Sequence, residues 1–170
     1  MYTRREDIQR NIEELAAFSS VRGCGCTRMS YTKEFKQAGN YLKEEMKKAG
    51  LTVREDPAGT VIGRLEGKDP SRKLPILMTG SHFDTVKTGG RFDGAAGVIA
   101  ALEAARCFQR EALVPDYPIE FVAMPEEEGG RFGGGLFASR AMIGALSEDE
   151  LQVRMCFEAY HSDRWTTQFD

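Results

Sequence analysis

The chain has 170 residues, which suits one ordinary domain, and 23 basic against 26 acidic side chains give a net charge of −3. A mildly acidic chain without a basic stripe is not expected to bind nucleic acid or an anionic membrane surface. Four cysteines are too few for a disulfide scaffold, and no apolar run reaches the ~18 residues of a membrane span. The charged first segment is unlike a signal peptide. We therefore expect a cytoplasmic protein.

The first elements in chain order are two predicted amphipathic helices. Residues 4–20 carry apolar side chains at helical spacing, namely Ile8, Ile12, Leu15 and Phe18. Thr3 and Glu6 fit a capping box at the start of this helix. The second helix is predicted over residues 33–49, and Gly50 is expected to end it.

Strands and helices alternate in the rest of the chain. Strand-like segments are predicted at residues 51–55, 60–65, 74–79 and 119–124. A buried apolar helix is predicted over residues 94–108, with further helices over 137–145 and 148–155. This alternation favours an α/β layered fold.

Glycine is concentrated where the chemically active side chains lie. Ten of the 18 glycines fall between Gly80 and Gly135, and glycine gathers where backbone turns tightly or approaches another group closely. Residues 80–84 directly follow one predicted strand, and residues 125–129 directly follow another. Because ligand sites in open α/β sheets form at the carboxyl ends of strands, we expect these two segments to meet in one crevice.

The first segment contains a histidine with a carboxylate close by. A lone histidine is more often structural than a ligand, but Asp84 lies two positions after His82 and can accept a hydrogen bond from the second ring nitrogen. Asp93 stands among glycines, where aspartate is usually a turn residue, yet it directly precedes the predicted buried helix. His82 and Asp93 together suit a divalent metal such as zinc.

The second segment contains three consecutive glutamates, Glu126, Glu127 and Glu128. A solvated acidic loop is the simpler interpretation of such a run. Successive side chains diverge, however, so one carboxylate can bind a metal while its neighbour accepts a proton from a water whose pKa the metal lowers. That division of roles is the chemistry of hydrolysis at an amide or related carbon.

Other catalytic patterns are missing from the sequence. The glycine-rich segments match neither the P-loop nor the dinucleotide-binding pattern, which argues against phosphate binding. No serine stands in a G-x-S-x-G elbow, so a serine hydrolase is not expected.

Several motifs together resemble one enzyme family. TGSHFDTVKTGGRFDGAAGVIAALEAAR resembles the metal signature of the hydantoinase/carbamoylase amidases, PEEEGGRF their acidic motif, and ASRAMIG the stretch that follows it. This family belongs to the zinc-dependent aminoacylase/carboxypeptidase superfamily and includes N-carbamoyl-L-amino acid hydrolases, allantoate amidohydrolases and β-ureidopropionases. The resemblance implies an α/β three-layer zinc-aminopeptidase-like sandwich with a mixed sheet. Residues 1–150 would form the amino-terminal part of the catalytic domain, residues 151–170 show no family match, and the dimerisation domain is absent.

The resemblance also implies roles for individual residues. His82 would bind one metal, Asp84 would orient it, and Asp93 would bridge two metals. Glu128 would bind the second metal, and Glu127 would be the general base. The family implies zinc, with manganese, cobalt or nickel as other occupants, and hydrolysis of an N-carbamoyl or ureido C–N bond in a small molecule.

The sequence also departs from the family pattern. Family members carry a later H-I-E-Q-G motif and a still later histidine that complete the two metal sites, and neither is present. His161 is interpreted as an exposed tail residue rather than a substitute ligand. Each metal would keep two ligands, so we expect weak or single occupancy and little or no activity from the chain alone. We therefore expect either a non-catalytic truncated fragment, which could form a homo-oligomer, or one half of a split enzyme that needs a second chain.

Overall fold

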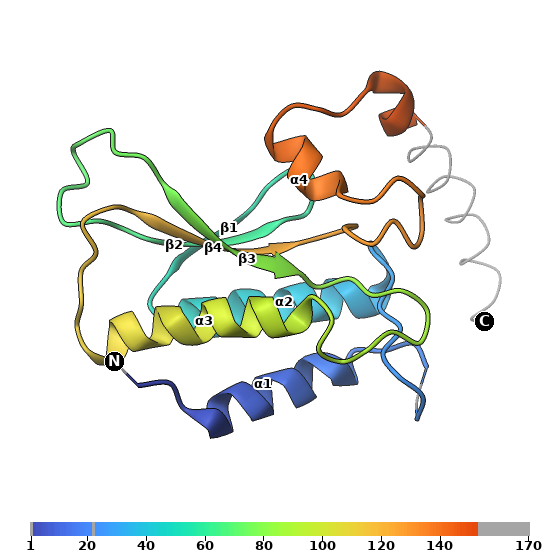
Figure 1. Cartoon of the computed structure of the whole chain (residues 1–170), viewed down its shortest axis with the longest axis horizontal. Helices are drawn as coiled ribbons and strands as arrows, with labels where there is room; N and C mark the ends of the chain where they lie inside the picture. The colour runs from blue at the N-terminus through green and yellow to red at the C-terminus, as the bar shows by residue number, and fades with distance from the viewer. Residues whose placement is uncertain (1, 22, 153–170) are drawn as a thin grey trace.

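The computed structural model describes residues 2–21 and 23–152, and it forms an α/β fold around a four-stranded mixed sheet (Figure 1). The strands lie in the order β1-β2-β4-β3. They are β1 (Thr52–Glu55), β2 (Val61–Leu65), β3 (Leu77–His82) and β4 (Ile119–Met124). The helices are α1 (Arg5–Ala17), α2 (Lys33–Lys48), α3 (Ala95–Arg110) and α4 (Phe137–Met142).

Helices lie on both sides of the sheet, which confirms the predicted layered α/β architecture. α2 packs against β1 and β2, α3 packs against β3 and β4, and α1 packs against α3 (Figure 1). α4 lies on the opposite side of the sheet from these three helices (Figure 1). The core between the sheet and the helices consists of fully buried apolar side chains, among them Leu15, Leu42, Ile99, Leu102 and Phe121.

The sheet combines antiparallel and parallel pairing. β1 and β2 form an antiparallel hairpin, β2 pairs antiparallel with β4, and β3 runs parallel to β4. β4 is therefore a central strand, and it buries Glu120 between Arg54 and Arg64, whose guanidinium nitrogens lie 3.2 and 3.3 Å from the Glu120 carboxylate. A buried carboxylate needs such partners, because unpaired charge is costly inside a protein.

The third strand begins later than predicted. The expected strand at residues 74–79 is found at Leu77–His82, so His82 is the last strand residue and does not lie in a loop. Pairing decides this shift, because β3 aligns in parallel with β4 from Leu77 opposite Ile119 to His82 opposite Met124. Gly80 permits the close approach, since a Cβ there would lie 2.0 Å from the Val122 carbonyl oxygen.

The capping box predicted for the first helix is wrong. α1 begins at Arg5 with Arg4 as its N-cap, and no side chain caps it. The backbone N–H of Arg4 instead donates to Glu103 Oε1 of α3 at 2.9 Å. A tertiary contact with a buried carboxylate thus replaces the local cap that Thr3 and Glu6 suggested. The second helix does have a side-chain cap, since Thr32 Oγ1 accepts from the Phe35 N–H at 3.3 Å.

The first of the two predicted carboxyl-terminal helices is shorter than expected. The helix expected over residues 137–145 ends at Met142, and Gly144 follows with a φ of +69°. Residues 148–152 are helical, which agrees with the first part of the helix expected over 148–155. The rest of that segment and His161 lie outside the described residues. No helix within residues 2–21 and 23–152 is both long enough and apolar enough to cross a membrane.

Candidate metal centre

The parallel pairing of β3 and β4 brings the two predicted segments together. His82 lies directly opposite Met124 in the sheet, so the strand that ends at His82 and the strand that precedes Glu126 finish at the same edge. The acidic segment therefore begins beside the imidazole of His82. This is the arrangement expected from the rule that α/β ligand sites form at the carboxyl ends of parallel strands.

Three of the predicted site residues converge on one point. His82 Nε2 lies 3.8 Å from Asp93 Oδ1 and 3.5 Å from Glu128 Oε1. One ligand atom from each of the three residues lies within 4.8 Å of the others. The His82 side chain is 14% exposed, Glu128 is 31% exposed and Asp93 is 53% exposed, so the cluster opens to solvent on the carboxylate side.

Asp93 reaches the cluster because the chain turns sharply just before α3. Gly94 is the N-cap of α3 and has a φ of +62°, a conformation that favours glycine. A Cβ at Gly94 would lie 2.4 Å from the imidazole of His82. The glycine beside Asp93 is therefore required both for the backbone turn and for the close packing against the histidine.

Asp84 links the histidine to the acidic segment. Its side chain is buried, and its two carboxylate oxygens accept from the backbone N–H groups of Glu127 and Glu128 at 3.3 and 3.4 Å. His82 Nδ1 lies 3.0 Å from the Asp84 carbonyl oxygen and 3.6 Å from Asp84 Oδ1. The interaction with the Asp84 carboxylate raises the pKa of His82, while partial burial acts in the opposite direction. Asp84 thus holds both the ring and the start of the acidic segment in place.

The carboxylate of Glu127 is fixed by a residue to which the sequence analysis assigns no role. Ser139, on α4, donates both its backbone N–H at 3.1 Å and its hydroxyl at 2.7 Å to Glu127 Oε1. The backbone carbonyl of Glu127 accepts from the Leu136 N–H at 2.9 Å. These contacts anchor α4 to the acidic segment. The ASRAMIG stretch contains Ser139, but only the fold shows which carboxylate it contacts.

Glu126 is a buried structural residue, so a solvated acidic loop is the wrong interpretation for this position. Its side chain is 1% exposed, and its φ of +54° is uncommon for a residue with a side chain. Its carboxylate accepts from the backbone N–H groups of Arg131 and Phe132 at 3.4 and 3.1 Å, and its own N–H donates to the hydroxyl of Ser30. Glu126 therefore shapes the glycine-rich loop that follows the acidic segment.

Arg28 supports the segment around Asp84 from the core side. It is 1% exposed, and its guanidinium donates to the carbonyl oxygens of Phe83 at 2.6 Å and Leu15 at 2.7 Å. Its backbone N–H donates to Thr85 Oγ1, and the Thr85 N–H returns a bond to the Arg28 carbonyl. Burial lowers the pKa of this guanidinium from its ordinary value. Arg28 thus ties α1 to the residues on either side of Asp84.

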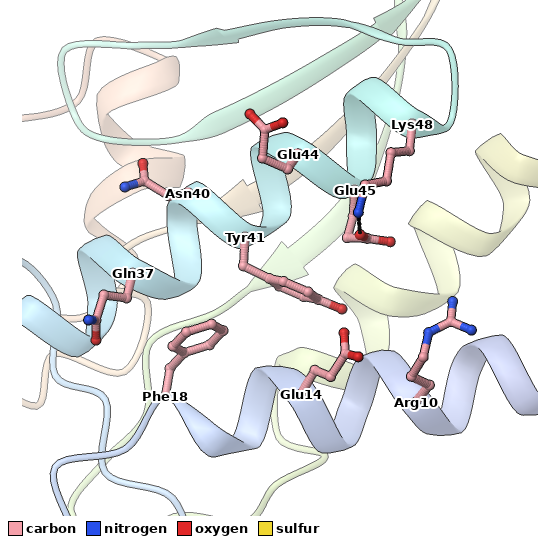
Figure 2. A pocket seen from close by; sticks show the side chains of 9 residues that line it. All are labelled: Arg10, Glu14, Phe18, Gln37, Asn40, Tyr41, Glu44, Glu45 and Lys48. Atoms are coloured by element: carbon pink, nitrogen blue, oxygen red, sulfur yellow. Dashed lines mark hydrogen bonds and ion pairs between the residues drawn. The ribbon is translucent and has the colours of Figure 1, made fainter.

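A large cavity lies elsewhere, between α1 and α2, and has a volume of about 660 Å³ (Figure 2). Figure 2 shows Tyr41 reaching from α2 toward Glu14 of α1 and Phe18, which directly follows α1. Lys48 and Glu45 at its side pair with each other at 2.7 Å. None of the predicted site residues lines this cavity, so it is separate from the candidate metal centre.

Comparison with known proteins identifies the family. The family model for peptidase family M28 matches residues 60–164 of the chain, which include the histidine and the acidic segment. The chain therefore belongs to peptidase family M28. Within it, the resemblance to the hydantoinase/carbamoylase amidases is confirmed by individual relatives of known sequence and structure.

The relatives share sequence and fold with this chain but are much longer. An N-carbamoyl-L-amino-acid amidohydrolase from Paenarthrobacter aurescens is 49% identical over 86% of this chain and 35% of its own length. An allantoate amidohydrolase from Bacillus subtilis is 39% identical over 86% of this chain and 35% of its own length. The crystal structure of a hydantoinase/carbamoylase family amidase from Burkholderia ambifaria superimposes with a TM-score of 0.81 at 31% identity, covering 87% of this chain and 36% of that chain. The chain thus spans about a third of the length of these relatives.

Proposed function

We propose that the chain is the amino-terminal part of the catalytic domain of a metal-dependent amidohydrolase, with residues 1–150 as that part. The proposed reaction is hydrolysis of a linear C–N bond in a small N-carbamoyl or ureido substrate. The observation that carries the proposal is the convergence of His82, Asp93 and Glu128 at the ends of two parallel strands. Relatives named as N-carbamoyl-L-amino-acid and allantoate amidohydrolases support the substrate class.

The three converging side chains fit a divalent metal ion. One imidazole nitrogen and two carboxylate oxygens are suitable ligands for zinc, and in a tetrahedral zinc site neighbouring ligand atoms lie about 3.4 Å apart. The separations of 3.5 and 3.8 Å around His82 Nε2 are close to that value. We therefore propose that His82, Asp93 and Glu128 hold one zinc ion, with manganese, cobalt or nickel as other occupants. The binding of a second metal by Glu128 and the bridging of two metals by Asp93 stay predictions for a more complete site.

The chain's own groups supply the remaining chemistry. A bound divalent metal would polarise a substrate carbonyl oxygen and lower the pKa of a nearby water. Glu127 is the proposed general base, which accepts the proton from the attacking water at its carboxylate. Because Ser139 occupies Oε1 of Glu127 with two hydrogen bonds, the orientation of that carboxylate is set before substrate binds. Asp84 is the proposed orienting residue, since it holds both the ring of His82 and the backbone of Glu127 and Glu128.

The length of the relatives limits what the chain is expected to do alone. It spans about a third of the N-carbamoyl-L-amino-acid amidohydrolase it resembles, 35% of that protein's length. We therefore expect little or no hydrolysis by this chain by itself. We propose that full activity requires the polypeptide corresponding to the remainder of the relatives, and a homo-oligomer is the alternative source of missing groups.

The first experiment measures metal bound per chain. The chain is purified without chelator, dialysed against zinc and then against metal-free buffer, and its metal content is determined. We expect about one equivalent of zinc for the parent chain, as three protein ligands suffice for an open zinc site. Asp93→Ala is expected to abolish binding. Asp116→Ala, which removes an exposed carboxylate paired with Lys68, should bind as much zinc as the parent.

Retention of full zinc binding by Asp93→Ala would show that Asp93 is not a ligand. If the parent binds zinc, assays with N-carbamoyl amino acids and allantoate then test the substrate class. These assays are run on the chain alone and on the chain mixed with the remaining segment of the Paenarthrobacter aurescens relative. Hydrolysis of neither substrate class in the mixture would contradict the proposed reaction even if the metal binds.

A further inference from the structure

A small cavity with an aromatic lining lies on the α2 side of the sheet. Its volume is about 330 Å³, and its lining includes Phe35 of α2, Val61 of β2 and Phe83, which follows β3. The rings of Phe35 and Phe83 are buried and stacked, with centroids 4.2 Å apart. Gly39 also lines the cavity, and a Cβ there would lie 3.7 Å from the ring of Phe83. Because Gly39 has no side chain, α2 lies close to the ring of Phe83 and position 39 adds no bulk to the cavity.

The cavity is bordered by an excess of positive charge. Lys33, Lys36 and Lys43 all line it, and their spacing places them on one face of α2. Lys43 is paired with Glu55, the one acidic residue in the lining. Lys33 and Lys36 are exposed, and within the described part of the chain neither has an ion-pair partner. Two ammonium groups are thus available beside an apolar cavity.

We propose that this cavity binds a small aromatic carboxylate, with its ring beside the half-buried Tyr31, above the floor that Phe35 and Phe83 form, and its carboxylate near Lys33 and Lys36. Ligand cavities in proteins have volumes of about 300–1,000 Å³ and combine a mostly apolar lining with a few polar groups that fix orientation. This cavity is at the lower end of that range, which suits a single ring. A free phosphate would gain from the lysines but would leave the aromatic lining unused, so the lining favours an anion that carries a ring.

The cavity is separate from the candidate metal centre, but it lies close to the glycine-rich loop that follows the acidic segment. The cavity shares no residue with His82, Asp93 and Glu128. Tyr31 lines the cavity, and its ring lies 5.8 Å from the ring of Phe132. The backbone N–H of Phe132 in turn donates to the buried carboxylate of Glu126. A ligand in the cavity is therefore expected to change the chemical shifts of Tyr31 and Phe132, which lie between the cavity and the acidic segment.

The test is a titration of the full chain with benzoate, followed by the shifts of backbone amides in heteronuclear NMR spectra. We expect saturable shifts at Tyr31, Gly39 and Gly59, which all line the cavity. The neutral isostere benzamide should bind more weakly than benzoate, because it lacks the charge that the lysines attract. The double variant Lys33→Gln/Lys36→Gln should weaken benzoate binding about tenfold, the combined effect of two partly screened charge interactions.

Two further variants separate the cavity from general charge effects. Lys47→Gln/Lys48→Gln makes the same charge change at the other end of α2, where the lysines pair with Glu44 and Glu45, and it should leave benzoate binding unchanged. Gly39→Leu should fill the cavity and abolish binding. Absence of saturable shifts with benzoate, equal affinity of the Lys33→Gln/Lys36→Gln variant, or equal affinity for benzamide would each overturn the proposal. If Gly39→Leu does not fold, the two lysine variants still decide the question.

Discussion

The helix-covered face of the sheet and its open edge at β3 differ sharply in the burial of their apolar residues. In the central strand β4, Phe121 is 1% exposed and Ala123 is 0% exposed, and both belong to the core under the helices. In the adjoining edge strand β3, Leu77 is 53% exposed and Met78 is 52% exposed. Whether an apolar side chain is buried therefore depends on the strands and helices that pack beside it, and not on its residue type alone.

Charged side chains show the same contrast between the two regions. On the helix-covered side Arg28 is 1% exposed and Glu103 is 1% exposed, and both make several hydrogen bonds or ion pairs. At the end of β3, Asp93 is 53% exposed beside His82. On the covered side, charged side chains form hydrogen bonds and ion pairs that link helices and segments. At the open edge, carboxylates stay exposed and are available to a ligand.

The largest expected loss of stability comes from Arg28→Met, which removes a support of the covered side. The carbonyl oxygens of Leu15 and Phe83 would lose their guanidinium donor in a buried environment. We expect the free energy of unfolding to fall by about 3–5 kcal/mol. Urea denaturation followed by circular dichroism measures this change. Arg72→Met on the exposed segment before β3 is the control, and an equal effect of the two variants would contradict the contrast.

A matched pair of leucines tests the contrast with the same chemical change. Leu102 of α3 is 0% exposed and Leu77 of β3 is 53% exposed. Leu102→Ala leaves a cavity and should cost about 3 kcal/mol of unfolding free energy. Leu77→Ala removes a side chain that already contacts solvent and should cost less than about 0.5 kcal/mol. If Leu77→Ala is as destabilising as Leu102→Ala, β3 is covered in solution, and sedimentation analysis would then show whether the chain self-associates.

A smaller loss of stability is expected from Asp84→Asn, which lies where the two regions meet. The amide would present an N–H₂ group to one of the two backbone N–H donors of Glu127 and Glu128. We expect a loss of about 1–3 kcal/mol in unfolding free energy and zinc affinity lower by about 10–100-fold. Denaturation without metal and zinc titration measure the two effects separately. Asp116→Asn is the exposed control, and unchanged zinc affinity in Asp84→Asn would contradict its role as an orienting residue.

Most secondary-structure elements could be predicted from the sequence, because their periodicity and end signals are local. The helices at Arg5–Ala17, Lys33–Lys48 and Ala95–Arg110 are predicted from apolar spacing, and Gly50 follows the second of them with a φ of +79°. Among the predictions that failed at element ends, two failed because long-range contacts compete with local signals. Glu103 of α3 takes the Arg4 N–H that a capping box would leave free, and pairing with β4 moves β3 toward His82.

The sequence by itself determined the family resemblance, the layered α/β class and the candidate site residues His82, Asp84, Asp93, Glu127 and Glu128, because these depend on motifs and local spacing. Only the tertiary structure decided how the three neighbouring glutamates differ. Glu126 is buried under the glycine-rich loop, Glu127 is held by Ser139, and Glu128 lies beside His82. The physical reason is that the chain after the acidic segment folds back so that Arg131 and Ser139 reach Glu126 and Glu127, while the parallel pairing of β3 with β4 brings His82 beside Glu128.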